Sequence, residues 1–250
     1  MSFLSFNEHS SPKQQGRYTC LYNLKKTLSK DTHVGVSQAA IAFRTPQIDF
    51  NPQRVVSDLF NKRAEVLAQC PPRFDTRQTN EVAVEQYGDI WVISSDALTM
   101  PLLENPHYNA SELHRTLGSP AMIIPFCQYD SGGTYGYAFI ENGVLTRSRL
   151  HSCDNPVQQF GPLKPFEERW ASAEFYLEED NCPQDEWQKI YYLGDREVEV
   201  PEFGLSSRLS YEALSEYLGI CPWDNALKPR IWYLRLHDLP LPRKPWWKFW

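Results

Sequence analysis

The segment AMIIPFCQYDSGGTYGYAFIENGVLTRSRL, from Ala121 to Leu150, contains three runs of apolar and aromatic residues, each long enough for a β-strand. DSGG (130–133) separates the first run from the second, and ENG (141–143) separates the second from the third. Asn-Gly between such runs is the strongest short signal of a hairpin, because both residues tolerate a positive φ. The segment therefore predicts an antiparallel meander of three strands.

Further strands and helices are predicted on both sides of this meander. Alternating or short apolar runs predict strands in SFLSF (2–6), AAIAF (39–43), VAVEQYGDIWVIS (82–94, two strands), IYYLGDREVEV (190–200, a hairpin over 194–195) and RIWYLRL (230–236). Helical spacing or capping residues predict helices in 18–30, 51–70, 96–104, 111–117, FEERWASAEFYL (166–177) and YEALSEYLG (211–219, capped by Ser210). Mixed strands and helices with adjacent hairpins indicate an α+β fold rather than a doubly wound parallel sheet. We expect one domain over 1–239, followed by an arm over 240–250.

The composition is that of a globular protein, with 42% hydrophobic and 22% charged residues. A net charge of −6 argues against a general nucleic-acid binder, since such a protein needs basic surface to displace counterions. The opening MSFLSFNEHSS lacks the basic and apolar regions of a signal peptide, and no apolar run is long enough to span a bilayer. We therefore expect a cytoplasmic protein whose six cysteines are free thiols.

The charge is unevenly distributed along the chain. Residues 174–202 contain ten acidic and two basic residues, whereas residues 228–250 contain six basic residues and one acid. These segments are either solvated or neutralise one another within the fold, or else the acidic one meets a basic partner. In the last case complementary charge would speed the encounter and exclude wrong partners.

The end of the chain, PRKPWWKFW (242–250), combines tryptophans and a phenylalanine with basic residues. Leaving these aromatic rings in water would favour aggregation, so we expect them to contact something. The alternatives are packing on their own domain, docking on a protein partner, and contact with a membrane surface. Prolines at 240, 242 and 245 prevent the long amphipathic helix that suits a membrane surface, so membrane contact is the least expected of the three.

Motifs of catalysis are absent or weak. The DSGG run lacks the Lys-Ser/Thr that follows the glycines of a phosphate-binding loop. We therefore interpret DSGG as a hairpin turn. His107 and His114 do not have a metal-ligand spacing such as HxxxH or HExxH, and no metal or cofactor is predicted. His151 and Cys153 are candidates for a base and a nucleophile, because an imidazole can deprotonate a thiol. No catalytic site emerges from the sequence.

Three segments carry a resemblance: YGYAFIENGVLTRSRLHS (135–152), FGPLKPFEERW (160–170) and VPEFGLSSRLSYEALSEYLGI (200–220). Together they resemble an uncharacterised bacterial family, a domain of unknown function, over about residues 121–219. The family pattern has a G-x-L-x-R-S strand, here 143–148, and then a loop with Gly, Pro-Phe-Glu and Trp, here Gly161, 165–167 and Trp170. The PEFGL segment departs from that pattern, and the tryptophan-rich end is not a family feature. The resemblance implies a fold and no activity.

Paired acids at 167 and 168 begin a predicted helix, where the helix dipole favours negative charge. Glu167 is expected to cap or pin the loop that holds Trp170. This is a structural role, not acid–base catalysis.

These observations favour a non-catalytic protein that binds another protein. A concrete form is an immunity-type inhibitor that covers the active site of a basic bacterial toxin or effector. The alternative is a hydrolase that uses Cys153 with His151, or His107 with His114. The residues expected to contact the partner are acids and aromatics: Glu178, Glu179, Asp180, Asp185, Glu186, Trp246, Trp247, Phe249 and Trp250.

Overall fold

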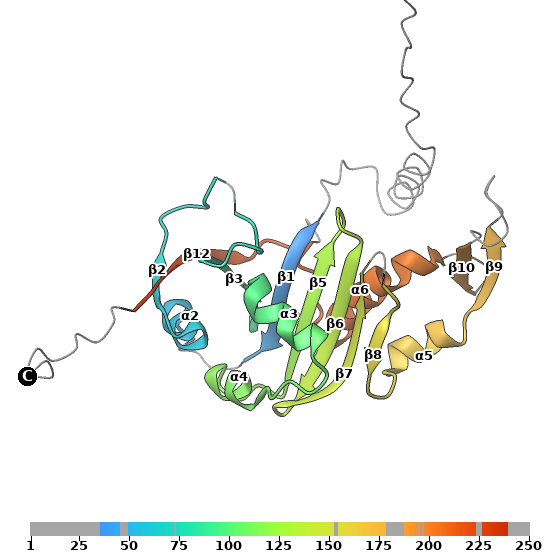
Figure 1. Cartoon of the computed structure of the whole chain (residues 1–250), viewed down its shortest axis with the longest axis horizontal. Helices are drawn as coiled ribbons and strands as arrows, with labels where there is room; N and C mark the ends of the chain where they lie inside the picture. The colour runs from blue at the N-terminus through green and yellow to red at the C-terminus, as the bar shows by residue number, and fades with distance from the viewer. Residues whose placement is uncertain are drawn as a thin grey trace, which may run out of the picture. The chain divides into compact units, whose positions relative to one another are not determined.

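The computed structural model of the chain is shown in Figure 1. It describes residues 36–45, 50–72, 74–152, 155–178, 188–194, 196, 198–223 and 227–239. The strand predicted at 2–6, the helix predicted at 18–30 and the arm predicted at 240–250 lie outside these residues. Both predicted domain boundaries therefore stay predictions.

Nine antiparallel strands form one large sheet (Figure 1), in the order β2-β12-β3-β4-β1-β5-β6-β7-β8. The bounds are β1 Ser37–Arg44, β2 Arg63–Val66, β3 Glu81–Tyr87, β4 Ile90–Ser94, β5 Met122–Tyr129, β6 Thr134–Glu141, β7 Val144–His151, β8 Gln158–Phe160 and β12 Arg230–His237. This sheet, accompanied by several short helices, confirms the predicted α+β class. The strands predicted within 39–43, 82–94 and 230–236 are also confirmed.

The predicted meander is present as β5, β6 and β7 in succession. Asn142 and Gly143 have φ angles of 51° and 82° at the β6–β7 turn, the left-handed conformation that the Asn-Gly signal requires. Glu141 pairs with Met122 on one side and with Val144 on the other, and the β6–β7 register shifts by one residue between Phe139 and Ile140.

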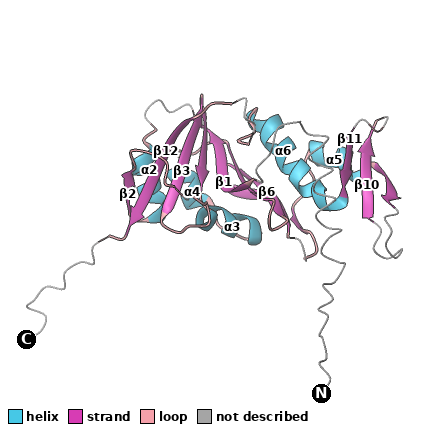
Figure 2. Ribbon diagram, turned by 90° about the horizontal axis from the view of Figure 1, so that it is seen from above, coloured by secondary structure: helices cyan, strands magenta, loops and turns pink. Residues whose placement is uncertain are grey.

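Helices cover both faces of the large sheet. Along β1, residues 39, 41 and 43 belong to one hydrophobic core, and residues 40 and 42 belong to another. A strand buried on both faces is almost continuously apolar, which explains AAIAF. The first core lies under α2 (Pro52–Phe60), α3 (Asp96–Glu104) and α4 (Ser111–Thr116), and the second under α5 (Pro165–Ala171) and α6 (Leu205–Leu218). Figure 2 shows α3 and α6 on opposite sides of the sheet.

A second, smaller sheet follows α5. It consists of three antiparallel strands in the order β11-β10-β9, with β9 over Glu174–Glu178, β10 over Gln188–Leu193 and β11 over Val198–Pro201. The hairpin predicted over 194–195 is confirmed as β10 and β11.

The helix that begins after Asn51 is shorter than predicted. The side chain of Asn51 accepts a hydrogen bond from the Arg54 backbone N–H at 3.0 Å, and Pro52 is the first helical residue, as predicted. The predicted end near residue 70 is wrong. Asn61 has a left-handed φ of 49° that ends the helix after Phe60, and the next residues pair with β12 as β2.

Two other predicted helices have the wrong bounds. FEERWASAEFYL was expected to be one helix, but α5 stops at Ala171 and β9 begins at Glu174, where the apolar period becomes two. Ser210 does not cap a helix. It lies buried inside α6, and its hydroxyl donates to the Ser206 carbonyl oxygen at 2.9 Å, because apolar residues extend the helix back to Leu205.

Candidate functional site

The small sheet has one face packed against the body of the protein. Side chains of Tyr191, Leu193, Val198 and Val200 belong to or contact the core under α6. Register places each of these on the same face, because side chains alternate along a strand. This packing fixes the small sheet to the body and leaves the other face to carry the acidic residues.

The opposite face, which we term the acidic face, carries Glu174, Tyr176, Glu178, Tyr192 and Glu199. Glu174 lies opposite Tyr192 on β10, and Tyr192 lies opposite Glu199 on β11. The Tyr192 hydroxyl donates to Glu174 Oε2 at 2.5 Å, and the Tyr176 hydroxyl donates to Glu199 Oε2 at 3.2 Å. Two tyrosines and three carboxylates therefore share one small surface.

A single arginine lies over these two tyrosine rings. The Arg196 Cζ atom is 5.0 Å from the ring centroid of Tyr176 and 4.9 Å from that of Tyr192, within the range of cation–π attraction. The hydrogen bond to Glu174 raises the pKa of Tyr192, and Arg196 acts in the opposite direction. The face is thus able to hold a guanidinium.

Within the described ranges, no ion pair joins the carboxylates of the acidic face, Glu174, Glu178 and Glu199, to a basic side chain. Glu174 and Glu199 lie on either side of Tyr192 and have the same charge, so a cation that approaches them would reduce their repulsion.

The edge strand β9 also presents apolar side chains. Phe175 is 50% exposed and Leu177 is 45% exposed, both on the face opposite to the carboxylates. Phe175 contacts the Tyr191 ring at a centroid distance of 5.8 Å, and Lys189 Nζ lies 5.1 Å from the Phe175 ring centroid. We term Phe175 and Leu177 the apolar edge.

Of the nine residues predicted to contact a partner, Glu178 lies on this sheet, where it accepts a hydrogen bond from Gln188 Nε2 at 3.0 Å. The other eight, at 179, 180, 185, 186, 246, 247, 249 and 250, lie outside the described residues. The residues that sequence reasoning missed are Glu174, Tyr176, Tyr192, Arg196 and Glu199. The alternation in EFYLE was the signal that would have placed the first two on one face.

The predicted structural role of Glu167 is confirmed. Glu167 Oε2 accepts a hydrogen bond from the Lys164 backbone N–H at 2.8 Å, which closes the start of α5. Its carboxylate also accepts from Arg147 at 2.6 Å and from the Tyr137 hydroxyl at 2.5 Å, and all three side chains are buried. Burial and this carboxylate raise the pKa of Tyr137. These hydrogen bonds and this ion pair hold the start of α5 against β6 and β7 of the large sheet.

The histidines proposed for catalysis do not form a site within the described residues. His114 Nε2 contacts the Pro120 carbonyl oxygen at 3.0 Å, whereas His107 packs edge-on against Phe160. His151 ends β7, and burial together with Arg149 lowers its pKa. Cys153 lies outside the described residues, so its pairing with His151 stays a prediction.

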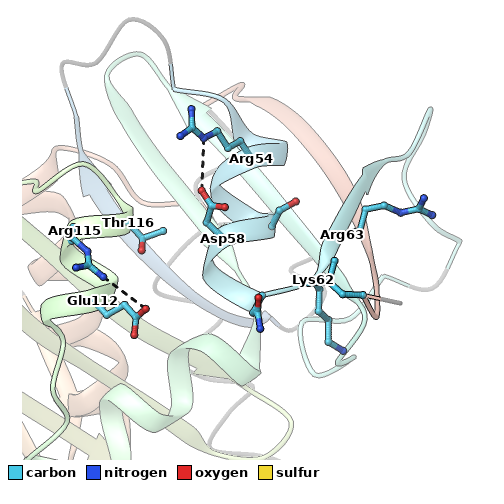
Figure 3. Close-up of a pocket in the computed structure, with 10 residues that line it drawn as sticks. Arg54, Asp58, Lys62, Arg63, Glu112, Arg115 and Thr116 are labelled. Carbon is cyan, nitrogen blue, oxygen red and sulfur yellow. Dashed lines mark ion pairs between the residues drawn. The ribbon is translucent and has the colours of Figure 1, made fainter. Parts of the chain in front are cut away.

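A shallow hollow of about 670 Å³ lies beside α2, α4 and Leu239 (Figure 3). Its charged side chains pair mainly within their own helices, Arg54 with Asp58 at 3.8 Å and Arg115 with Glu112 at 3.9 Å. These four groups are more than half exposed, so water screens them and none is held in a defined position. The hollow therefore lacks the convergent, buried polar groups of a reaction site.

In comparisons with protein families, with curated proteins and with solved structures, the chain gave no match. The resemblance to an uncharacterised bacterial family therefore stays a prediction. Across the described part of the chain, no three side chains of the His, Cys, Asp and Glu types gather as metal ligands, and no helix has the length and apolarity to cross a bilayer.

Proposed function

We propose that this protein binds another protein, without catalysis, through the acidic face of the small sheet. The observation that carries the proposal is the set of three carboxylates around two tyrosines without an ion pair among the described residues. A basic surface on the partner would neutralise this charge and speed the encounter. Tyrosine suits such a surface, because its ring adds contact area and its hydroxyl a hydrogen bond.

In its most concrete form, the proposal is an immunity-type inhibitor that covers the active site of a basic bacterial toxin or effector. Inhibition of this kind needs complementary shape and charge and no catalytic group of its own. The aromatic arm, with Trp246, Trp247, Phe249 and Trp250, is proposed as a second anchor.

The test compares three versions of the full chain in affinity capture from the lysate of its native host. One is the natural chain, and the second carries Glu174→Gln, Glu178→Gln and Glu199→Gln. The third is a control with the same change in charge elsewhere, Asp58→Asn, Glu104→Gln and Glu112→Gln, at exposed positions of α2, α3 and α4. Equal melting temperatures establish that all three are folded.

We expect a protein that the natural chain and the control retain and that the acidic-face variant loses. Its affinity should fall at least about tenfold in the variant, because each removed charge weakens a favourable contact. Equal retention by all three chains would place the interface elsewhere. The same comparison with a chain that ends at Leu241 measures how much the aromatic arm contributes.

A further inference from the structure

We infer that the partner is recognised through an extended segment that adds as a strand to the free edge of β9. Its basic side chains would face Glu174, Tyr176 and Glu178, and its apolar side chains would face Phe175 and Leu177. The inference rests on the proposed function, because it concerns the partner of the same surface and adds the conformation and residue pattern that the surface selects.

The edge of β9 is suited to strand addition. Among the strands that the structure describes, β9 pairs with β10 alone, so no described strand occupies the backbone N–H and C=O groups on its other side. Strand addition is a common way to bind an extended segment, since main-chain hydrogen bonds provide affinity and alternate side chains provide specificity. β9 has five residues, the usual length of a strand.

The two faces of β9 differ in chemistry, and this difference sets the pattern of the partner. Acidic and tyrosine side chains occupy positions 174, 176 and 178, whereas apolar side chains occupy positions 175 and 177. An added strand continues the pleat, so its own side chains alternate between the same two faces. The complementary segment therefore alternates basic and apolar residues.

A cationic side chain on the acidic face has a counterpart within the protein itself. Arg196 lies 5.0 Å from the Tyr176 ring centroid, yet it forms no ion pair with a carboxylate of the described residues. An arginine of the added strand would meet the same ring together with the carboxylates of Glu174 and Glu178. These two residues lie on β9 itself, on either side of Tyr176.

Charge also disfavours a second copy of this chain in the register centred on Tyr176. If two β9 strands paired antiparallel about Tyr176, Glu174 of each copy would lie opposite Glu178 of the other. Like charges directly opposite on neighbouring strands destabilise the pair. Charge on an edge strand is a common protection against self-association, and here it favours a basic partner.

The test uses two blocked peptides of about eight residues, a usual strand length. One alternates arginine and valine, and the other contains the same residues as a block of arginines followed by a block of valines. Calorimetric titration into the full chain at low ionic strength should show that the alternating peptide binds at least about tenfold tighter, since only it places its valines over the apolar edge.

Two further measurements separate strand addition from simple charge attraction. In the added strand, the backbone N–H groups of the arginines point to one edge and those of the valines to the other. N-methylation of every arginine, or of every valine, therefore blocks the N–H groups of one edge. Only the peptide that is methylated on the edge facing β9 should lose its affinity. Leu177→Asp should abolish the preference for the alternating peptide. Val66→Asp is the matched control, because Val66 is an apolar residue, 42% exposed, on the edge strand β2.

Equal affinity for the two peptides, each weakened by the acidic-face variant, would overturn strand addition and leave the proposed function intact. If Val66→Asp lost binding and Leu177→Asp did not, the added strand would lie on β2 of the large sheet instead of β9, and the inference would be overturned. Failure of both peptides to bind would count against both proposals.

Discussion

Arg147 on β7 is one of the largest side chains that the fold buries completely, with a relative exposure of 1%. Its guanidinium donates to Glu167, to Gln159 Oε1 at 2.8 Å and to the backbone carbonyls of Phe160 and Gly161 at 3.0 and 3.2 Å. A buried ion pair is tolerated only when its hydrogen bonds are completed in this way. One side chain thus joins β7, β8 and the start of α5.

Replacing Arg147 by methionine should destabilise the protein by about 3–5 kcal/mol, because the Glu167 carboxylate would stay buried without its cation. Chemical denaturation followed by circular dichroism measures the loss. Arg54→Met is the control, since Arg54 is paired with Asp58 on the exposed side of α2 and should change stability little. If both variants unfold at the same denaturant concentration, the network does not hold the fold together.

Glu85 on β3 gives the stability a dependence on pH. Burial raises the pKa of its carboxyl, although the hydrogen bond from the Tyr87 hydroxyl at 2.5 Å acts in the opposite direction. The folded state therefore keeps the proton over a range of pH in which the unfolded chain has lost it. The contribution of Glu85 to stability is fully present below the ordinary pKa of a glutamate and is lost as the pH rises through the folded pKa.

Glu85→Gln removes this loss, so the stability of the variant relative to the natural chain should increase as the pH rises above about 4, the ordinary pKa of a glutamate. Urea unfolding of both chains at several pH values measures the difference. Two parallel pH profiles would show that Glu85 titrates alike in the folded and unfolded states.

At the scale of the element, the loop between β8 and α5 depends on Gly161. Its φ is 75°, and a Cβ atom placed there would lie 2.0 Å from the Thr146 carbonyl oxygen. Gly88, in the β3–β4 turn, has a similar φ of 66° but no atom within 4 Å of such a Cβ. The two glycines therefore separate the cost of the backbone conformation from the cost of close packing.

Gly88→Ala should cost about 1–2 kcal/mol, the penalty of a left-handed alanine. Gly161→Ala should cost at least about 3 kcal/mol, because overpacking adds to that penalty. Thermal unfolding of the two variants provides the comparison. Similar melting temperatures would mean that the β7 backbone moves away from the new methyl group without strain.

Elements whose signals are local were predictable from the sequence. The meander could be predicted, since its turn residues and its alternating runs lie within thirty residues of one another. The end of α2 and the start of β9 could not be predicted in this way. Helical spacing of apolar residues continues past Phe60, where the chain becomes extended because β12 supplies a strand partner from a distant part of the sequence. After Ala171 the alternation in EFYLE is only five residues long, and the strand forms there because β10, the next strand along the chain, pairs with it.

At the scale of the whole molecule, the acid-rich segment was visible in the sequence, but the acidic face was not. Ten acids between 174 and 202 predicted a charged surface without showing which of them lie together. The register of β9, β10 and β11 brings Glu174 and Glu199 to either side of Tyr192, although they are far apart in the chain. The position of Arg196 over two tyrosines has no sequence signal of its own.

The small sheet is the surface that we propose to bind a partner. Amide hydrogen exchange of the full chain, measured with and without the captured protein, tests this proposal. Exchange should slow in β9 and in the neighbouring strands β10 and β11, and it should stay unchanged in β2 and at the hollow beside α2 and α4. Protection confined to β2 or to that hollow, with β9 unchanged, would show that the partner binds elsewhere than at the small sheet.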